Sequence, residues 1–492
     1  MEFRRWQPLD RLAIALIAVL TVLIGLLLLN GDQTVPYVRN FSWDQQQISA
    51  NDQAFTITFS RPMAHQSVEQ HLKLEPPVGG KFSWSGRKMA YTVTTPLIYG
   101  QTYKLTLDNA HDAFASKSVI KPFNSSFSTP DPAFAYIGLS ADEIGRLVIY
   151  DLPKNTKQIL TPANLTILDF RIYSDRSKIL FSAVPKTSGF INPLEQRLYT
   201  VSLSSSNEVN KPKLVLDSGD FQNLKFDLSS DGKAIVVQRL SRVKIGQYGL
   251  WVIRDGEEPK SLDNQPGGDF LIAPDNESVA IAQGEGVAIL PLQEGGTPLD
   301  FLPRFGTVLS FSKDGAEAVM VKYNKDYTRS LFRVTNQGVQ TEILKTKGSI
   351  LSAEFDRAKQ NIYGIFTDVK QTATSYQETP YIGTINLKTG QLQRLQNLPL
   401  WQRDTKLSLA PDDTALLFNQ ALEASANPFS PRTKIDFLAL PDNLSNNPNH
   451  KDRVLSENPT ENSENKIAQV TSKSQLSDRF PEILGTHPEW LP

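Results

Sequence analysis

The stretch LSSDGKAIVV, residues 228–237, places an Asp-Gly pair between two runs in which apolar and polar residues alternate. Such alternation is typical of half-buried β-strands, and Asp-Gly is a pair that tight turns between strands favour. The carboxylate of Asp231 can accept hydrogen bonds from backbone N–H groups of the turn, and Gly232 can adopt a positive φ without strain. The stretch therefore predicts a strand, a tight turn and a second strand.

The same phrase returns along the chain. The aligned copies carry aspartates at Asp175, Asp231, Asp275, Asp314 and Asp412, and a degenerate copy at residues 357–363 fills the longest gap. An all-strand repeat of about 40–55 residues predicts the blades of a β-propeller. We interpret the five aspartates as structural turn residues. A metal-binding or catalytic set is the alternative, but turn capping accounts for each copy by itself.

A second apolar strand follows each turn, and one more such strand, RLVIYDLPKNTKQIL from residue 146, precedes the first turn. Six turns with one leading half-repeat permit seven blades, with six as the alternative. The paired phrases resemble the repeats of TolB-type, WD40-like propellers over residues 131–444, although the only Trp-Asp pair lies outside them. The resemblance implies a fold and no particular activity, because such propellers carry many functions.

The N-terminal part contains LAIALIAVLTVLIGLLLL, residues 12–29, which has no charged residue. A helix of this length and composition is expected to span a membrane. Arg4, Arg5 and Arg11 precede it, so the positive-inside rule predicts a cytoplasmic segment at residues 1–11 and an exported remainder. A cleaved signal peptide is the alternative reading. Residues 30–53 are polar and are predicted to form a stalk.

Residues 54–130 contain short alternating runs separated by Pro and Gly, which predicts a β-sandwich. The sequences FSRPM from Phe59, LKLEP from Leu72, FSWS from Phe82 and PLIYG from Pro96 resemble, in this order, the bacterial Ig-like domain of S-layer proteins over about residues 35–130. Ala64 and the segment His111-Asp112-Ala113 depart from the family pattern, so no calcium site is inferred there. The overall prediction is an all-β chain with one anchor helix.

The segment 445–492 is predicted to be a tail. Its first part is rich in Asn, Glu, Ser and Pro, a composition typical of disorder. Residues 480–492 are apolar again. They are expected either to pack back on the propeller or to recruit a partner.

Composition excludes several classes of function. The chain has 51 basic and 52 acidic residues, so no global field favours nucleic acid. It has no cysteine, and none of its five histidines falls within residues 131–444. No metal site, cofactor or nucleophile motif is predicted, and the chain is not expected to be an enzyme. The alternative is an extracytoplasmic glycan-active hydrolase or lyase that uses carboxylates in the propeller channel.

The connections between the second and third strands of the repeats are long and irregular, and we call this side the loop end. The opposite side, with the Asp turns, is the turn end. Long loops on a rigid scaffold usually carry recognition, which predicts binding at the loop end. The candidate binding residues are Phe190, Arg239, Arg242, Lys244, Tyr248, Tyr376 and Phe429. The expected function is a membrane-anchored binding or scaffold protein of the bacterial envelope, with an envelope protein or a cell-wall glycan as partner.

Overall fold

The computed structural model describes residues 8–30, 35–49, 52–114, 118–186, 191–203, 211–262, 267–293, 295–372, 375–400, 402, 405–422, 432–440 and 481–492. The chain divides into two compact units. The smaller unit comprises residues 1–48, 53–94 and 102–128, and the larger comprises 49–52, 95–101 and 129–492.

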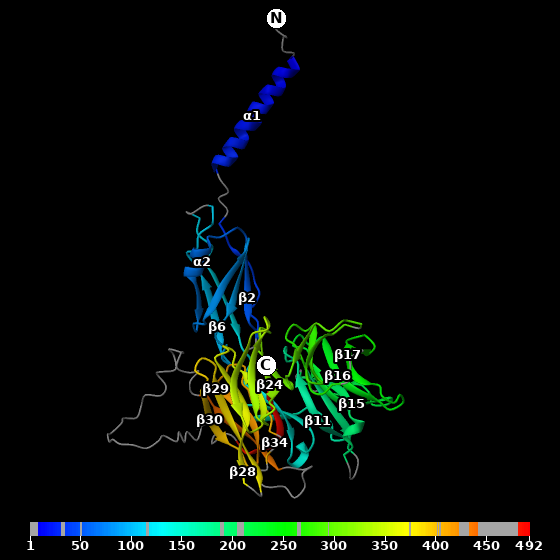
Figure 1. Cartoon of the computed structure of the whole chain (residues 1–492). Coiled ribbons are helices and arrows are strands. Elements are labelled where there is room, and N and C mark those ends of the chain that lie inside the picture. Colours follow the sequence, from blue (N-terminus) through cyan, green and yellow to red (C-terminus); the bar gives the residue numbers. More distant parts are fainter. Residues whose placement is uncertain are drawn as a thin grey trace, which may run out of the picture. The chain divides into compact units, whose positions relative to one another are not determined.

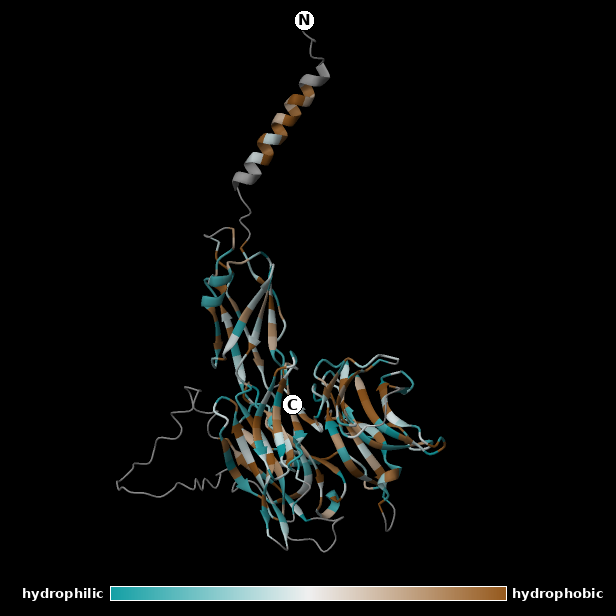
Figure 2. Cartoon of the chain, viewed as in Figure 1, coloured by the Kyte–Doolittle hydropathy of each residue, from teal (hydrophilic) through white to brown (hydrophobic). Residues whose placement is uncertain are grey.

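The first helix, α1 (Pro8–Asn30), covers the apolar segment, and its side chains are described for residues 12–25. Figure 2 shows these residues mostly in the hydrophobic colours. Within the described part of the chain, no helix meets both the length and the hydropathy needed to cross a membrane.

The smaller unit is a β-sandwich of two antiparallel sheets. One sheet has the order β1 (Val38–Phe41), β2 (Ala54–Phe59), β5 (Lys88–Val93) and β4 (Gly80–Ser85), and the other has β3 (Leu72–Glu75), β6 (Thr102–Leu107) and β7 (Phe123–Ser128). Between β2 and β3 lies the short helix α2 (His65–His71).

The predicted stalk at residues 30–53 needs a correction, because β1 pairs with β2 inside the sandwich. Phe41 and Trp43 are 3% and 6% exposed, and both rings pack against Phe55 with centroids 5.2 Å away. Phe41 and Trp43 were the signal for this strand, because burying each aromatic ring contributes strongly to stability.

The larger unit contains five separate four-stranded antiparallel sheets, each formed by consecutive strands. The first sheet contains β11 (Leu165–Ile172), β12 (Lys178–Pro185), β13 (Arg197–Ser202) and β14 (Lys213–Leu216), and the second contains β15 (Phe221–Leu228), β16 (Ala234–Ser241), β17 (Tyr248–Arg254) and β18 (Lys260–Ser261). The third contains β19 (Phe270–Ile272), β20 (Ser278–Gln283), β21 (Gly286–Pro291) and β22 (Asp300–Pro303), and the fourth contains β23 (Thr307–Phe311), β24 (Glu317–Tyr323), β25 (Arg329–Thr335) and β26 (Gln340–Thr346). The fifth contains β27 (Ile350–Phe355), β28 (Asn361–Gln371), β29 (Tyr376–Asn386) and β30 (Leu392–Asn397). Figure 1 shows β15, β16 and β17 side by side in one such sheet.

A sixth, seven-stranded sheet combines the two ends of this unit. Its order is β10 (Thr156–Ile159), β9 (Leu147–Asp151), β8 (Ala133–Gly138), β34 (Ile483–Trp490), β33 (Thr433–Ala439), β32 (Ala415–Ala421) and β31 (Leu407–Leu409). Strands from the start and the end of the unit are therefore joined through β34.

Hydrophobic clusters join each sheet to the next. Among the described residues there are seven such clusters. Six connect successive sheets from β8–β10 through to β31–β33. The seventh connects β31–β33 back to β8 and β9, through residues such as Phe437, Leu417 and Phe134. The series of sheets closes on itself, which is the architecture of a β-propeller.

The strand β34 closes this series, between β33 and β8 (red in Figure 1). It pairs with β33 at Ile483 and Leu484, and with β8 from Gly485 to Trp490. Trp490 is 7% exposed, and its ring lies 6.1 and 6.0 Å from those of Phe134 and Phe437. Arg176 donates from Nε to the carbonyl of Pro492 at 2.5 Å and from Nη2 to that of Leu491 at 3.1 Å.

β34 has the features of an inner strand, the first strand of each four-stranded sheet. Its pairing with β8 shifts register between Thr486 and Glu489, as β11 does against β12 between Ile167 and Asp169. The backbone N–H of Trp490 donates to Ser408 Oγ at 3.2 Å, a link to the preceding inner strand. In this register β34 is the inner strand of the sheet that β8, β9 and β10 continue.

This placement corrects the predicted boundaries. The sequence ends the propeller at residue 444 and predicts a tail over 445–492, whose apolar residues 480–492 either pack back on the propeller or recruit a partner. Residues 483–490 do pack back, as a strand of the larger unit, so the propeller extends beyond residue 444. Two features hid this strand: about forty residues separate it from β33, and Pro488 weakens a strand assignment because proline cannot donate to a ladder. Residues 441–480 lie outside the described residues.

We predict that Trp490→Ala lowers the free energy of unfolding of the larger unit by about 3–5 kcal/mol, because it empties a buried aromatic site at the closing strand. Calorimetry on the full chain measures this as a lower midpoint for that transition. Trp84→Ala, in the smaller unit, is the matched control and leaves the same transition unchanged. An unaltered midpoint for Trp490→Ala would contradict closure by β34.

Candidate functional site

The predicted turn aspartates form one recurring local structure. Each accepts a hydrogen bond at Oδ1 from the backbone N–H two residues further on, at distances between 2.9 and 3.2 Å. The residue after each aspartate has positive φ: Arg176, Gly232, Asn276, Gly315 and Asp413. At Gly232 a Cβ would also lie 2.8 Å from the Tyr173 ring. The geometry of the turn therefore accounts for the repeated phrase.

The predicted loop-end residues do not all face solvent. Arg239 is 5% exposed; its guanidinium lies 4.2 Å from the centroid of the Phe221 ring, and its Nε donates to Asn223 Oδ1 at 3.2 Å. Its place in β16 thus makes it a packing residue of the sheet. Tyr248 is half-buried and donates its hydroxyl to the carbonyl of Gly267 at 3.0 Å.

Arg242 and Lys244 lie in the connection between β16 and β17. Arg242 donates from Nη2 to the carbonyl of Leu194 at 2.7 Å and to Glu195 Oε1 at 3.1 Å, which ties two neighbouring connections together. Lys244 is exposed. Tyr376 is 58% exposed and donates its hydroxyl to Glu378. Phe190 and Phe429 lie outside the described residues.

Of the exposed apolar side chains at the loop end, sequence reasoning found Tyr376 and missed the others. Nine large apolar residues are exposed in the second-to-third connections and the strand ends beside them: Ile144, Ile191, Leu194, Val243, Ile245, Tyr323, Tyr327, Tyr376 and Leu422. Val243 and Tyr327 are 72% and 92% exposed, and Ile245 is fully exposed. The described residues of the Asp turns include no exposed large apolar side chain. The third-to-fourth connections at the same end, with the strand ends beside them, have four: Leu214, Leu299, Phe301 and Val339.

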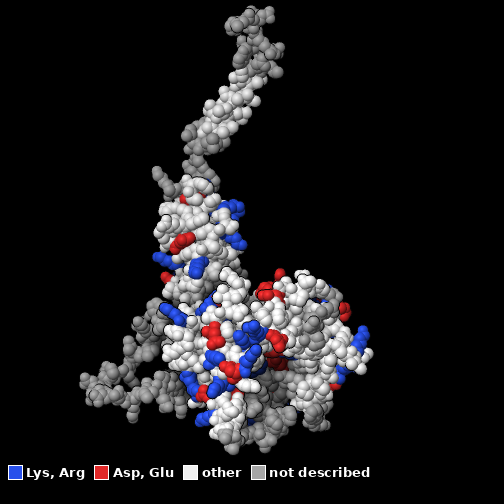
Figure 3. All heavy atoms as spheres, viewed as in Figure 1, with Lys and Arg blue, Asp and Glu red and all other residues white. Residues whose placement is uncertain are grey.

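A concentration of exposed apolar side chains usually marks an interaction site, because it leaves apolar area in water that a partner would cover. Charges give no comparable signal: Figure 3 shows basic and acidic residues interspersed on the visible face of the larger unit. The alternating RVKI sequence at 242–245 carried the signal for the most exposed part of this surface.

A group of charged side chains lies on the inner strands, and we call it the inner-strand cluster. It consists of Asp169, Arg171, Asp227, Glu354, Lys406 and Glu489. Arg171 Nη1 donates to both carboxylate oxygens of Asp169 at 3.2 Å, and its Nε lies 3.4 Å from Asp227 Oδ1. The side chains of Asp169 and Arg171 are 31% and 24% exposed, so solvent reaches this cluster.

Members of the cluster also link one inner strand to the next. Asp227 accepts a hydrogen bond from the backbone N–H of Ile272 at 2.9 Å, and Glu354 accepts one from that of Leu409 at 3.0 Å. Arg171, Asp227 and Glu354 each precede the aspartate position of their turn by four residues. That fixed offset was a signal in the sequence, since apolar residues are expected on a buried inner strand.

Burial and neighbouring charges shift the pKa values of the carboxyl groups of the cluster in opposite directions. Burial raises the pKa of Glu489 to about 7, although Arg171 and Lys406 act against it. Burial likewise raises the pKa of Glu354 to about 7, against the Leu409 N–H and Lys313. Burial also acts on Asp169, but Arg171, Lys406 and His487 outweigh it and hold its pKa below the usual range. Carboxyl groups with pKa values pushed apart are typical of sites that bind or transfer charge.

The sequence-based expectation of a propeller without histidine also needs correction, because β34 brings His487 into the ring of inner strands. Thr486 Oγ1 lies 3.1 Å from its Nδ1. In the described part of the chain, no three side chains of His, Asp or Glu come together as a metal site would require.

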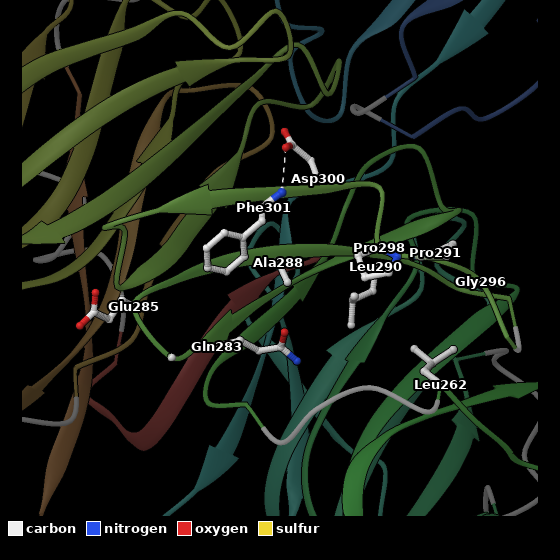
Figure 4. A pocket seen from close by; sticks show the side chains of 11 residues that line it. Leu262, Gln283, Glu285, Ala288, Leu290, Pro291, Gly296, Pro298, Asp300 and Phe301 are labelled. Carbon is white, nitrogen blue, oxygen red and sulfur yellow. Dashed lines mark hydrogen bonds between the residues drawn. The ribbon is translucent and has the colours of Figure 1, made fainter.

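A pocket of about 470 Å³ lies at the outer edge of the sheet β19–β22 (Figure 4). Leu262, Leu290 and Phe301 give it apolar walls. The carboxylate of Asp300 turns back onto the backbone N–H of Phe301 at 2.7 Å. Ligand sites usually combine apolar walls with convergent polar groups, and this pocket has few of the latter.

The smaller unit is thus a β-sandwich and the larger one a propeller-type ring of sheets. Residues 32–129 match the family model described as bacterial Ig-like domain. No curated protein matches the chain in sequence. Among solved structures, TolB from Acinetobacter baumannii is similar with 11% identity, 84% of this chain and 82% of that chain covered, and a TM-score of 0.39.

Two enzymes are similar at the same level. The periplasmic gluconolactonase of Pseudomonas aeruginosa has 11% identity, with 62% of this chain and 91% of that chain covered and a TM-score of 0.41. Prolyl oligopeptidase B from Galerina marginata has 9% identity, with coverages of 60% and 45% and a TM-score of 0.41. At these values the likenesses say nothing about activity.

We predict that Glu489→Gln changes stability in a pH-dependent way. The folded pKa of Glu489, about 7, exceeds the unfolded value of about 4.5, so the folded chain holds a proton that the unfolded chain releases between these pH values. The parent therefore loses stability relative to the variant as pH rises from 5 to 8. Thermal melts of both proteins at pH 5 and 8 measure the difference, with exposed Glu482→Gln as the control. If the difference in melting temperature between parent and variant were the same at pH 5 and pH 8, the placement of Glu489 would be contradicted.

Proposed function

We propose that the chain is a binding or scaffold protein of the bacterial cell envelope, which recognises a partner protein through the loop end of its propeller. The observation that carries this proposal is the set of nine exposed apolar side chains gathered there. Three of them are tyrosines, a residue enriched at protein interfaces because it joins apolar area to a polar tip. A cell-wall glycan is the other partner class, and exposed isoleucine, leucine and valine favour a protein.

Anchoring by residues 12–29 belongs to the same proposal. Its support is the charge-free apolar sequence, the three arginines before it and the continuous helix α1 across it. The Ig-like domain and the propeller then follow outside the cytoplasm. We further propose seven blades, counting β34 with β8–β10 and β31–β33 as separate sheets; the seven clusters between neighbouring sheets support this number.

A glycan-active enzyme is the second candidate. The opposite displacement of the pKa values of Glu489 and Asp169, which both face Arg171, supports it, because a protonated and an ionised carboxyl are what acid–base cleavage of a glycosidic bond needs. Release of reducing ends from peptidoglycan by the full chain, abolished by Glu489→Gln, would favour this candidate over a binding role.

We predict that replacing Val243 and Ile245 together by Ser reduces capture of the partner at least tenfold, because the apolar area that the partner covers is lost. Crosslinking in intact cells followed by purification of the full chain measures the captured protein. The matched control is Val339→Ser, which changes a 56% exposed valine at the turn end and leaves capture unchanged. Equal capture by all three proteins would contradict binding at the loop end.

We also predict that an alkaline phosphatase fusion after residue 130 is active and that the mature N-terminus is Met1 or Glu2, because an uncleaved anchor exports the rest of the chain. N-terminal sequencing of the membrane fraction tests this. A new N-terminus near residue 30 would rule out the anchor and leave the loop-end proposal standing.

A further inference from the structure

The carboxyl group of Glu489 stands out among the enclosed polar groups of the inner-strand cluster. Protein atoms surround it, yet the residue keeps partial exposure to solvent. No described residue donates a hydrogen bond to this carboxyl, and no described cation lies within ion-pair distance of it. A buried carboxylate without a partner is costly, so such a group usually has a ligand, a proton or a function.

Glu354 is a second incompletely satisfied carboxyl of the cluster. Its Oε1 accepts the N–H of Leu409 at 3.0 Å, and the N–H of Trp490, next to Glu489, donates to Ser408 on the same strand, β31. Burial raises the pKa of Glu354, the negative charges of Asp413 and Glu489 add to the rise, and Lys313 opposes it. Ser352 lies two residues earlier on β27, on the same face as Glu354. Its hydroxyl is buried and has no hydrogen-bond partner among the described residues.

The charges of the cluster favour a cation as ligand. Arg171 is already held by Asp169 and Asp227, and Lys406 is the other cation that acts on Glu489. Lys313 and Asp413 also act on Glu354, so five carboxyl groups face three cations, an excess of two. A divalent metal ion is disfavoured, because the described residues offer no group of three ligating side chains. A single organic cation can use two carboxylates and a hydroxyl acceptor, since guanidinium and ammonium groups carry several donors.

We propose that Glu489 and Glu354 form a proton-linked binding site for an organic cation, a guanidinium or alkylammonium group, that enters the ring of inner strands. The cation binds when the carboxyl groups are ionised, and the displaced proton passes to solvent. The neutral forms lack the charge that would hold it. This site is separate from the loop end and goes beyond the proposed binding function.

The test is a calorimetric titration of the full chain with N-acetyl-arginine methylamide at pH 6, 7 and 8. Affinity is expected to rise by up to about a hundredfold between pH 6 and pH 8, because the ionised fraction of each of two carboxyl groups with a pKa near 7 rises about tenfold. The lysine analogue is expected to bind with the same pH dependence. The neutral analogue N-acetyl-citrulline methylamide, of nearly the same shape, is expected to bind at least tenfold more weakly at pH 8.

Three variants locate the site. Glu489→Gln and Glu354→Gln are each expected to weaken binding at least tenfold and to reduce the pH dependence to about tenfold, because one titrating carboxyl remains, whereas exposed Glu482→Gln leaves affinity and pH dependence unchanged. Circular dichroism of each variant confirms that the ring is folded. Equal binding of the citrulline analogue, a pH-independent affinity, or full affinity in folded Glu489→Gln would overturn the proposal, as would Ca²⁺ binding in place of the organic cation.

One further ligand distinguishes the sources of the cation. Binding of an extended Gly-Ser peptide with one central arginine as tightly as the amide indicates a side chain presented by a partner. Binding of the amide alone indicates a free small molecule. Retention of cation binding by the loop-end variant with Val243 and Ile245 replaced separates this site from the proposed function.

Discussion

The pairing of β34 between β33 and β8 is the contact on which the larger unit depends. Every other sheet of this unit is made of consecutive strands and forms locally. Among the described strands, β34 alone hydrogen-bonds to strands from both ends, and it does so with a buried tryptophan and with the carbonyls of Leu491 and Pro492 held by Arg176. An open ring would leave the first and last sheets with apolar faces in water, because a blade buries both faces only against its neighbours.

Closure also brings the charged groups of the inner strands together. Glu489 and His487 reach the inner-strand cluster only because β34 takes the position of an inner strand. The cluster therefore combines residues that are more than 300 positions apart in the chain. The two ends of the sheets differ in another way: the turn end repeats one geometry around its aspartates, whereas the loop end varies in length and carries the exposed apolar side chains. Structural and recognition roles are thus separated along the strands.

Much of the fold could be predicted from sequence, because its signals are local. The Asp-turn phrase specifies a strand, a turn and a strand by itself, and the short alternating runs of residues 54–130 indicate the sandwich. The pairing of β34 could not be predicted in this way, since its partners are distant in the sequence and Pro488 interrupts its strand pattern. Arg239 was placed at a binding surface because the connection between the second and third strands was predicted to begin at residue 238, but β16 continues to Ser241 and its alternation directs Arg239 onto Phe221. In the inner-strand cluster, the positions of Arg171, Asp227 and Glu354 could be predicted, because each lies four residues before the aspartate position of its turn. The position of Glu489 could not, because β34 was not assigned as a strand.

Native-state hydrogen exchange of the full chain tests closure by β34 most directly. The backbone N–H of Leu491 donates to the carbonyl of Ala133 at 2.9 Å, and the amides of β34 and β8 pair along the strand. If closure holds the larger unit together, these amides exchange with the same free energy of opening as those of β11 and β15, in one cooperative event. Exchange of the β34 amides through a much smaller local opening, with β8 and β11 still fully protected, would contradict the account.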